Sequence, residues 1–206
     1  MRTDFSERQC LRKERRELSS VNRFKQLFQR YILGKTPEQI ELARLVEKGL
    51  KVGRNTAINA GFSIDGAWPW LISIGDDVTI STNVTILAHD ASTNIVRQST
   101  RLGRVTIGNN VFIGTRAVIL CGVTVGDNVV IGAGSVVTHD LPSDGVYAGV
   151  PARRICSIEA YREKYEKLRA ERPDFSQIRP WNQWAGATEA EKQQMYDGLA
   201  DGIGFI

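Results

Sequence analysis

Branched apolar residues recur at every sixth position through the middle of the chain. The longest run keeps one register, and two earlier runs keep the same spacing in shifted phases. The longest run is Ile107, Ile113, Ile119, Val125, Ile131 and Val137; the earlier ones are Val52, Ile58 and Ile64, then Ile74, Ile80 and Ile86. Because this period differs from the helical 3.6, it predicts short strands separated by turns, with each sixth side chain pointing inward.

Turn-forming residues lie at fixed places between these apolar positions. Glycine often follows the apolar residue, and asparagine or aspartate often follows the glycine, as in 108–110 and 126–128. Such residues adopt turn conformations that branched residues avoid. The pattern predicts a stacked β-coil in which three hexads close one triangular turn and each turn pairs with the next at about 4.8 Å.

Two breaks in the register predict insertions. One spans 67–71 and contains Trp68 and Trp70, and the other spans about 89–104 and has the polar composition of a loop. A coil cannot absorb extra residues internally, so both segments must bulge outward. Long loops on rigid repeats are frequent sites of function.

The segments on either side of the coil have helical spacing. In the N-terminal part, apolar residues recur at helix-like intervals around 24–31 and 40–46, and Thr36, Pro37 and Glu38 resemble a capped helix start. After the coil, a charged run predicts a helix that ends before Pro173. We therefore expect an N-terminal helical extension at 1–50, the coil at 51–155 and a C-terminal helical tail at 156–206.

Composition narrows the class of protein. The chain has 206 residues, 42% of them hydrophobic and 24% charged, which is close to the average for soluble domains. The charge of +4 is modest and gives no basic patch with interleaved aromatics, so we expect no nucleic-acid partner. Without a long apolar window or a secretory signal, we expect a cytoplasmic protein with no stable membrane insertion. Two histidines and three cysteines lacking Cys-x-x-Cys spacing predict no metal site.

The stretch NNVFIGTRAVILCGVTVGDNVVIGAGSVVTHDLPSDGVYAGVPARRI, residues 109–155, resembles the C-terminal half of hexapeptide-repeat acetyltransferases. The pairing of IGAGSVVT with AGVPAR is similar to the maltose and galactoside O-acetyltransferase branch, with its relatives that act on surface polysaccharides. The likeness covers about half of the chain and neither end. It implies a mainly β fold, a left-handed parallel β-helix, with acetyl-CoA as acyl donor and a homotrimer whose active sites lie between subunits.

Acetyl transfer to a hydroxyl needs a group that removes the hydroxyl proton, and a neutral imidazole suits this task at pH 7. His89 ends the ILAHD segment beside the second insertion, and the resemblance matches it to the catalytic histidine of the family. The alternative is a surface histidine at a turn. Asp90 points to the opposite face in an extended chain, so it either contacts the acceptor site or shapes the loop.

The resemblance implies acetyl-CoA contacts at Thr115, Ala133, Thr138, His139 and Arg153. Thr115 and Ala133 lie eighteen residues apart, one full turn, so they should stack on one edge along which a pantetheine arm can lie. Small residues there also suit a tight turn without a ligand.

Two departures concern the ends of this cofactor site. Arg153 would meet a CoA phosphate, but Cys156 stands where some relatives carry a second basic residue, which Arg154 or Arg162 would have to replace. Cys121 stands where relatives often have proline, and we interpret it as a turn residue. Direct transfer without an acyl-enzyme follows.

Acceptor contacts are expected at Asn59 and Asp65. Asn59 aligns with an acceptor-contacting asparagine of the sugar acetyltransferases, and Asp65 lies near the Trp68–Trp70 bulge. Sugars need hydrogen bonds for their hydroxyls and apolar surface for their C–H faces. The alternative is turn residues with a tryptophan pair that caps the core.

The sequence therefore supports an acetyl-CoA-dependent O-acetyltransferase that acts on a hydroxyl of a sugar or polysaccharide precursor. N-acetylation of an amino sugar or nucleotide-sugar would use the same base and donor. A hypothesis from another class is a non-catalytic trimeric β-helix scaffold.

Overall fold

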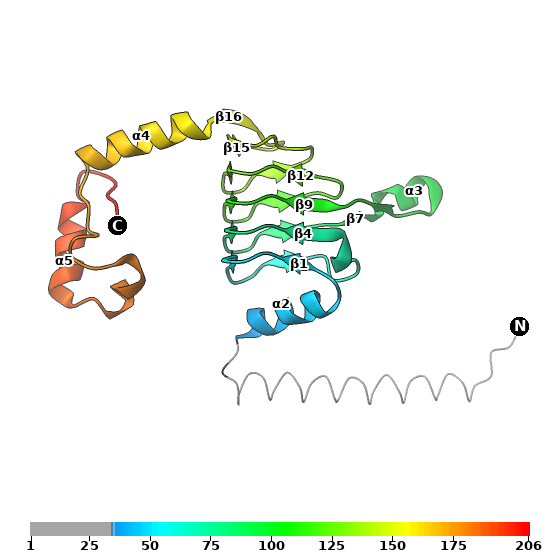
Figure 1. Cartoon of the computed structure of the whole chain (residues 1–206), viewed down its shortest axis with the longest axis horizontal. Coiled ribbons are helices and arrows are strands. Elements are labelled where there is room, and N and C mark those ends of the chain that lie inside the picture. The colour runs from blue at the N-terminus through cyan, green and yellow to red at the C-terminus, as the bar shows by residue number, and fades with distance from the viewer. Residues whose placement is uncertain (1–33, 35) are drawn as a thin grey trace, which may run out of the picture.

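The computed structural model describes residue 34 and residues 36–206 (Figure 1). The helical spacing expected at 24–31 lies outside the described residues. In Figure 1 the strands stack as a column of coils, with helix α2 below the first coil and helix α4 leaving from the last.

Short parallel strands form the three faces of a triangular prism. The first sheet contains β1 (Lys51–Val52), β4 (Ile72–Ile74), β9 (Val105–Ile107) and β12 (Thr124–Val125). The second contains β2 (Ala57–Ile58), β5 (Thr79–Ile80), β10 (Phe112–Ile113), β13 (Val129–Ile131), β15 (Gly145–Ala148) and the antiparallel β16 (Arg153–Ser157). The third contains β3 (Ser63–Ile64), β6 (Thr85–Ile86), β11 (Val118–Ile119) and β14 (Val136–Val137).

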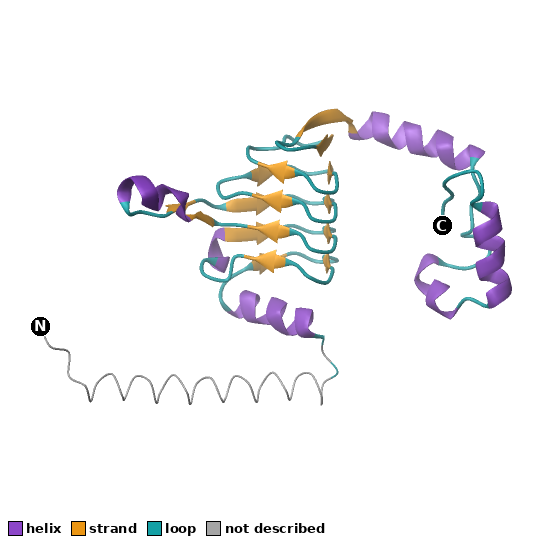
Figure 2. Cartoon of the chain, turned by 180° about the vertical axis from the view of Figure 1, so that it is seen from behind, coloured by secondary structure: helices purple, strands orange, loops and turns teal. Residues whose placement is uncertain are grey.

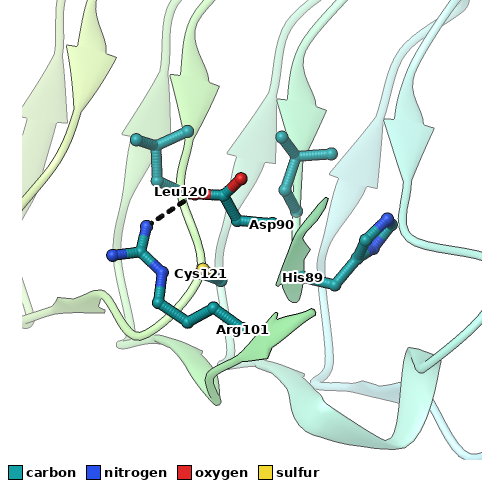
Figure 3. A pocket seen from close by; sticks show the side chains of 6 residues that line it. His89, Asp90, Arg101, Leu120 and Cys121 are labelled. Atoms are coloured by element: carbon teal, nitrogen blue, oxygen red, sulfur yellow. Dashed lines mark hydrogen bonds and ion pairs between the residues drawn. The ribbon is translucent and has the colours of Figure 1, made fainter. Parts of the chain in front are cut away.

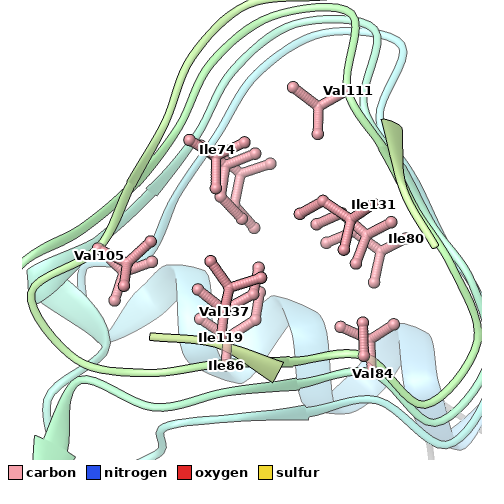
Figure 4. Packing of buried hydrophobic residues seen from close by; sticks show 14 of the residues in the cluster. Ile74, Ile80, Val84, Ile86, Val105, Val111, Ile119, Ile131 and Val137 are labelled. Atoms are coloured by element: carbon pink, nitrogen blue, oxygen red, sulfur yellow. The ribbon is translucent and has the colours of Figure 1, made fainter. Parts of the chain in front are cut away.

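The register of these strands confirms the expected hexad stacking. Ile80 pairs with Ile113, which pairs with Ile131 in the next coil. Figure 4 looks into the coil, where such side chains form columns inside a triangular outline. Ile80 and Ile119 are 0% exposed, so the residues that recur at every sixth position are those whose side chains point into the coil. Burying one such side chain stabilises the fold by roughly 1.5–3 kcal/mol.

Residues with left-handed backbone close many of the turns. Asn55, Asn110 and Asn128 have φ of 53°, 54° and 54°, a region that asparagine tolerates better than most residues. The Asn110 side chain donates to the Asn128 side chain at 2.8 Å, which links two neighbouring coils.

Both expected insertions leave the prism. The first contains the short helix η1 (Pro69–Leu71). The second begins with β7 (His89–Asp90), passes through η2 (Ala91–Thr93) and α3 (Asn94–Arg97), and returns through β8 (Arg101–Leu102), which pairs antiparallel with β7. Figures 1 and 2 show α3 at the far end of this arm, well away from the coils.

Helices flank the prism at both ends. α2 (Pro37–Glu47) begins at the N-cap Thr36, whose side chain forms a capping box with Gln39, and its Leu45 is fully buried. The expected helix before Pro173 is α4 (Ile158–Glu171), followed by η3 (Trp181–Gly186) and α5 (Glu189–Gly198). Figures 1 and 2 show α5 standing apart from the prism. In the described part of the chain, no helix has the length and apolar composition needed to cross a bilayer.

Candidate active site

The residues expected in the site fall on two corners of the prism. We call the corner between the second and third sheets the threonine edge; it carries Asn59, Thr82, Thr115 and Ala133. We call the corner between the third and first sheets the histidine edge; it carries both insertions, His89, Thr138 and His139. Within one chain the third sheet lies between the two edges.

Asp65 holds the His89 ring on the histidine edge. Asp65 follows β3, and one of its carboxylate oxygens contacts His89 Nδ1. The same oxygen accepts from the Ala88 N–H at 3.0 Å, and the other accepts from the Ala67 N–H at 3.0 Å. With Nδ1 occupied in this way, Nε2 is the imidazole nitrogen that remains for a further hydrogen bond.

The Asp65 carboxylate is held in its charged form. Its side chain is 1% exposed, whereas the His89 side chain is 33% exposed. Burial by itself would raise the pKa of Asp65, but hydrogen bonds from His89, Ala67, Ala88 and Trp68 outweigh it and hold this pKa below its ordinary value.

These contacts bear on the acceptor role expected for Asp65. It was predicted to contact the acceptor, but its buried oxygens are already engaged by the chain itself. The carboxylate faces His89 and orients it. The acceptor contact expected at Asp65 stays a prediction, and the contacts seen for its carboxylate are with groups of the chain itself.

Trp68 packs against the His89 ring. Its ring centroid lies 4.7 Å from that of His89, at an interplanar angle of 57°. Trp68 is partly buried against the core, and the neighbouring Trp70 is 55% exposed. The first insertion thus places an aromatic surface beside the imidazole, a contact that the sequence did not predict.

Asp90 belongs to the arm. Figure 3 shows its side chain and the His89 ring pointing in different directions, as expected for neighbours in a strand. Its carboxylate accepts from the Ser92 N–H at 2.9 Å and from Arg101 at 2.9 Å, which joins β7 to β8. These contacts support the reading in which Asp90 shapes the loop.

A small cavity opens where the arm meets the coils. It has a volume of about 170 Å³ and is lined by Leu87, His89, Asp90, Arg101, Leu120 and Cys121 (Figure 3). Two leucines and a free thiol make one wall largely apolar. Arg101 was not among the expected site residues, because only the β7–β8 pairing brings it opposite Asp90.

Thr138, His139 and Arg153 come together higher on the histidine edge. His139 Nδ1 lies 3.1 Å from the Thr138 hydroxyl, and Arg153 Nη1 lies 3.3 Å from His139 Nε2. Arg154, considered as a substitute for the missing basic residue at Cys156, instead donates to the Asp144 carbonyl at 3.2 Å. All of these side chains are exposed except that of the partly buried Cys156.

The threonine edge has the expected stacking of Thr115 and Ala133. The Gly134 N–H donates to the Thr115 carbonyl at 2.8 Å, so the two residues lie in adjacent coils. One coil below, the Thr82 hydroxyl lies 3.3 Å from the Thr115 hydroxyl. Both Thr115 and Ala133 are exposed, which leaves a narrow strip of small side chains along this edge.

Asn59 lies at the bottom of the threonine edge. Its side chain donates to the Ile80 carbonyl at 3.1 Å, and it lines a cleft of about 280 Å³ with residues of α2, including Gln39 and Leu42. Asn59 and His89 thus belong to different edges of one chain. Among the described residues, no three His, Cys, Asp or Glu side chains gather as a metal site.

Comparisons with known proteins show which family the chain resembles. Residues 104–139 match a family model described as the hexapeptide repeat of succinyl-transferase. Protein CapG of Staphylococcus aureus is 45% identical over 121 residues, which are 56% of this chain and 70% of that protein. The galactoside O-acetyltransferase of Escherichia coli is 41% identical over 119 residues, 56% of this chain and 58% of that enzyme.

A solved structure extends the likeness to the fold. The maltose O-acetyltransferase from Clostridium difficile superposes with a TM-score of 0.51 at 30% identity, covering 68% of this chain and 84% of that one. The left-handed parallel β-helix expected from the sequence is thereby confirmed. From the repeat, the coil register and these likenesses, we conclude that the chain belongs to the hexapeptide-repeat acetyltransferase family.

Proposed function

We propose that this protein transfers an acetyl group from acetyl-CoA to a hydroxyl of a sugar or polysaccharide precursor. The observation that carries the proposal is the Asp65–His89 pair, buried at its aspartate end and open at its imidazole end. Family membership supports the reaction class, and galactoside and maltose O-acetyltransferases among the similar proteins support a sugar acceptor.

His89 is the general base in this proposal. Asp65 accepts a hydrogen bond from His89 Nδ1–H and so fixes the tautomer, which leaves Nε2 free to take the proton of the attacking hydroxyl. Acetyl-CoA supplies the acetyl group as a thioester: a C–O bond to the acceptor forms, the C–S bond breaks, and the proton on Nε2 passes to the departing thiolate. A well-placed base of this kind contributes about 10²–10⁴-fold to the rate.

The donor is proposed to lie along the prism axis between two copies of the chain. Thr138, His139 and Arg153 offer a hydroxyl, an imidazole and a guanidinium above His89 on the histidine edge. Thr115 and Ala133 offer a strip of small residues on the threonine edge. Because one chain holds these sets on different corners, a site that uses both needs the histidine edge of one copy and the threonine edge of another, as in a homotrimer.

The acceptor is proposed to lie beside the first insertion. Trp68 presents an aromatic surface next to His89, which suits the C–H face of a sugar ring. Asn59 of a neighbouring copy would provide an amide for a sugar hydroxyl. Asp90 and Arg101 close the arm over the cavity and are assigned to the loop rather than to the sugar.

Release of free CoA tests the proposal. Wild-type protein is incubated with acetyl-CoA and a panel of neutral sugars and amino sugars, with His89→Ala as the matched control, and thiol is measured. We expect thiol release with a neutral sugar and almost none with the variant. Turnover only with amino sugars would replace the proposal of O-acetylation by one of N-acetylation. If the protein neither turns over any sugar nor binds CoA, the result would favour a non-catalytic scaffold.

A further inference from the structure

Arg116 occupies a backbone conformation that its residue type disfavours. Its φ is 61°, in the left-handed region. Within the described coils at 51–157, every other non-glycine residue with positive φ outside the arm is asparagine or aspartate. The equivalent positions one coil below and one coil above are Asn83 and Gly134, with φ of 58° and 69°. The turn itself therefore gives no reason for an arginine here.

The side chain of Arg116 is exposed and has no partner among the described residues. Two other arginines in this part of the chain are paired with carboxylates: Arg54 binds that of Asp76 at 2.7 Å and Arg101 binds that of Asp90 at 2.9 Å. Along the threonine edge the neighbouring positions are uncharged, among them Thr82 and Thr115. The guanidinium is thus an uncompensated positive charge on an edge of small, neutral residues.

From this placement we propose that Arg116 binds an oxyanion of a substrate, presented to the threonine edge. The proposal rests on the proposed function for the identity of the ligand, which is either a carboxylate on an acidic sugar acceptor or a phosphate of CoA. A planar guanidinium forms paired, charge-assisted hydrogen bonds with both groups. The adjacent Thr115, which lies at hydrogen-bonding distance from Thr82, provides a hydroxyl next to it.

The test compares Arg116→Asn with Arg116→Lys and with Lys51→Asn, which removes an equal charge from the first sheet. Asparagine suits the left-handed position, as Asn83 shows, so Arg116→Asn should fold with an unchanged or higher Tm. Calorimetric titration with CoA and KM values for glucose and glucuronic acid distinguish the two sources of the oxyanion.

We expect Arg116→Asn to raise either the Kd for CoA or the KM for glucuronic acid by about tenfold or more. The KM for glucose should stay unchanged. Arg116→Lys should recover part of the loss, and Lys51→Asn should change nothing. Values within twofold of wild type for all three ligands, or a clear fall in Tm, would overturn the proposal. If no sugar is acetylated, the proposed function fails separately, and CoA titration with direct titration of glucuronic acid still decides the role of Arg116.

Discussion

The threonine edge and the histidine edge are built from the same repeat but are used differently. On the threonine edge the coils turn without insertion, and successive coils place the small, exposed side chains of Thr82, Thr115 and Ala133 at equivalent positions. On the histidine edge both insertions leave the prism, and the Asp65–His89 pair lies between them. A uniform corner suits an extended arm that runs past several coils, whereas reactive groups collect where the repeat is interrupted. In our account each corner supplies half of a site.

Replacing His89 by alanine should have the largest effect. Without this imidazole the site loses its proposed general base, so we expect kcat to fall by about 10²–10⁴-fold. CoA titration should give nearly unchanged affinity. His139→Ala is the control: its ring contacts Thr138 and Arg153, so a moderate rise in KM for acetyl-CoA is expected, and an equal loss of kcat in both variants would contradict the assignment.

Asp65→Asn should have the next largest effect on activity. The amide keeps the shape but no longer selects the Nδ1–H tautomer, so we expect kcat to fall on the order of 10²-fold, near the lower end of the range for a lost base. Circular dichroism should show native secondary structure. A variant with wild-type kcat would remove Asp65 from the mechanism.

The same variant has a distinct acid response. The pKa of Asp65 is lowered in the fold, so its charged form stabilises the protein above the unfolded value of about 3.9, and this contribution disappears as pH falls through the folded value. Asp65→Asn lacks it. Urea unfolding between pH 6 and pH 3 should therefore show a shallower loss of stability in the variant, and parallel curves would contradict the direction of this pKa.

Smaller effects are expected from the arm. Asp90→Asn and Arg101→Gln each remove the exposed pair that joins β7 to β8, and exposed pairs of this kind contribute little to stability. We expect similar, few-fold reductions of kcat/KM, and a double variant no worse than either single one. Fully additive losses would mean that the two side chains act separately, for example with Asp90 on the acceptor.

The smallest effect should come from the threonine edge. Thr115→Val keeps the size but removes the hydroxyl beside Thr82. A single neutral hydrogen bond is worth about 0.5–1.5 kcal/mol, and the lower end applies to this exposed contact, so KM for acetyl-CoA should rise by about twofold with kcat little changed. An equally large loss of kcat would place Thr115 next to the reacting atoms.

The sequence predicts the prism well because the period of six depends only on which side chains point into the coil. It also predicts the Thr115–Ala133 stacking, since no insertion separates them and eighteen residues close one turn. The Asp65–His89 contact was missed for a related reason. The residues at 67–71 leave the coil, so Asp65 and His89 are not a whole turn apart in number. Only the strand register, in which Ile64 pairs with Ile86, brings them side by side.

Other parts of the site depend on pairings that no spacing encodes. Arg101 meets Asp90 because β7 and β8 form a hairpin inside the arm, which the sequence indicated only as a polar loop. Trp68 was expected near the acceptor, but its contact with the His89 ring depends on how η1 folds back.

Mixed oligomers test most directly whether one site is shared by two copies of the chain. His89→Ala disables the histidine edge, and Ala133→Tyr fills the threonine edge while leaving the other corner intact. The two variants, carrying different tags, are produced together, and the mixed oligomer is isolated through both tags before acetyl transfer is measured. We predict that each variant alone is inactive and that the mixed oligomer regains part of the wild-type activity, because some sites then combine two intact edges. A purified mixed oligomer as inactive as its parents would contradict the account.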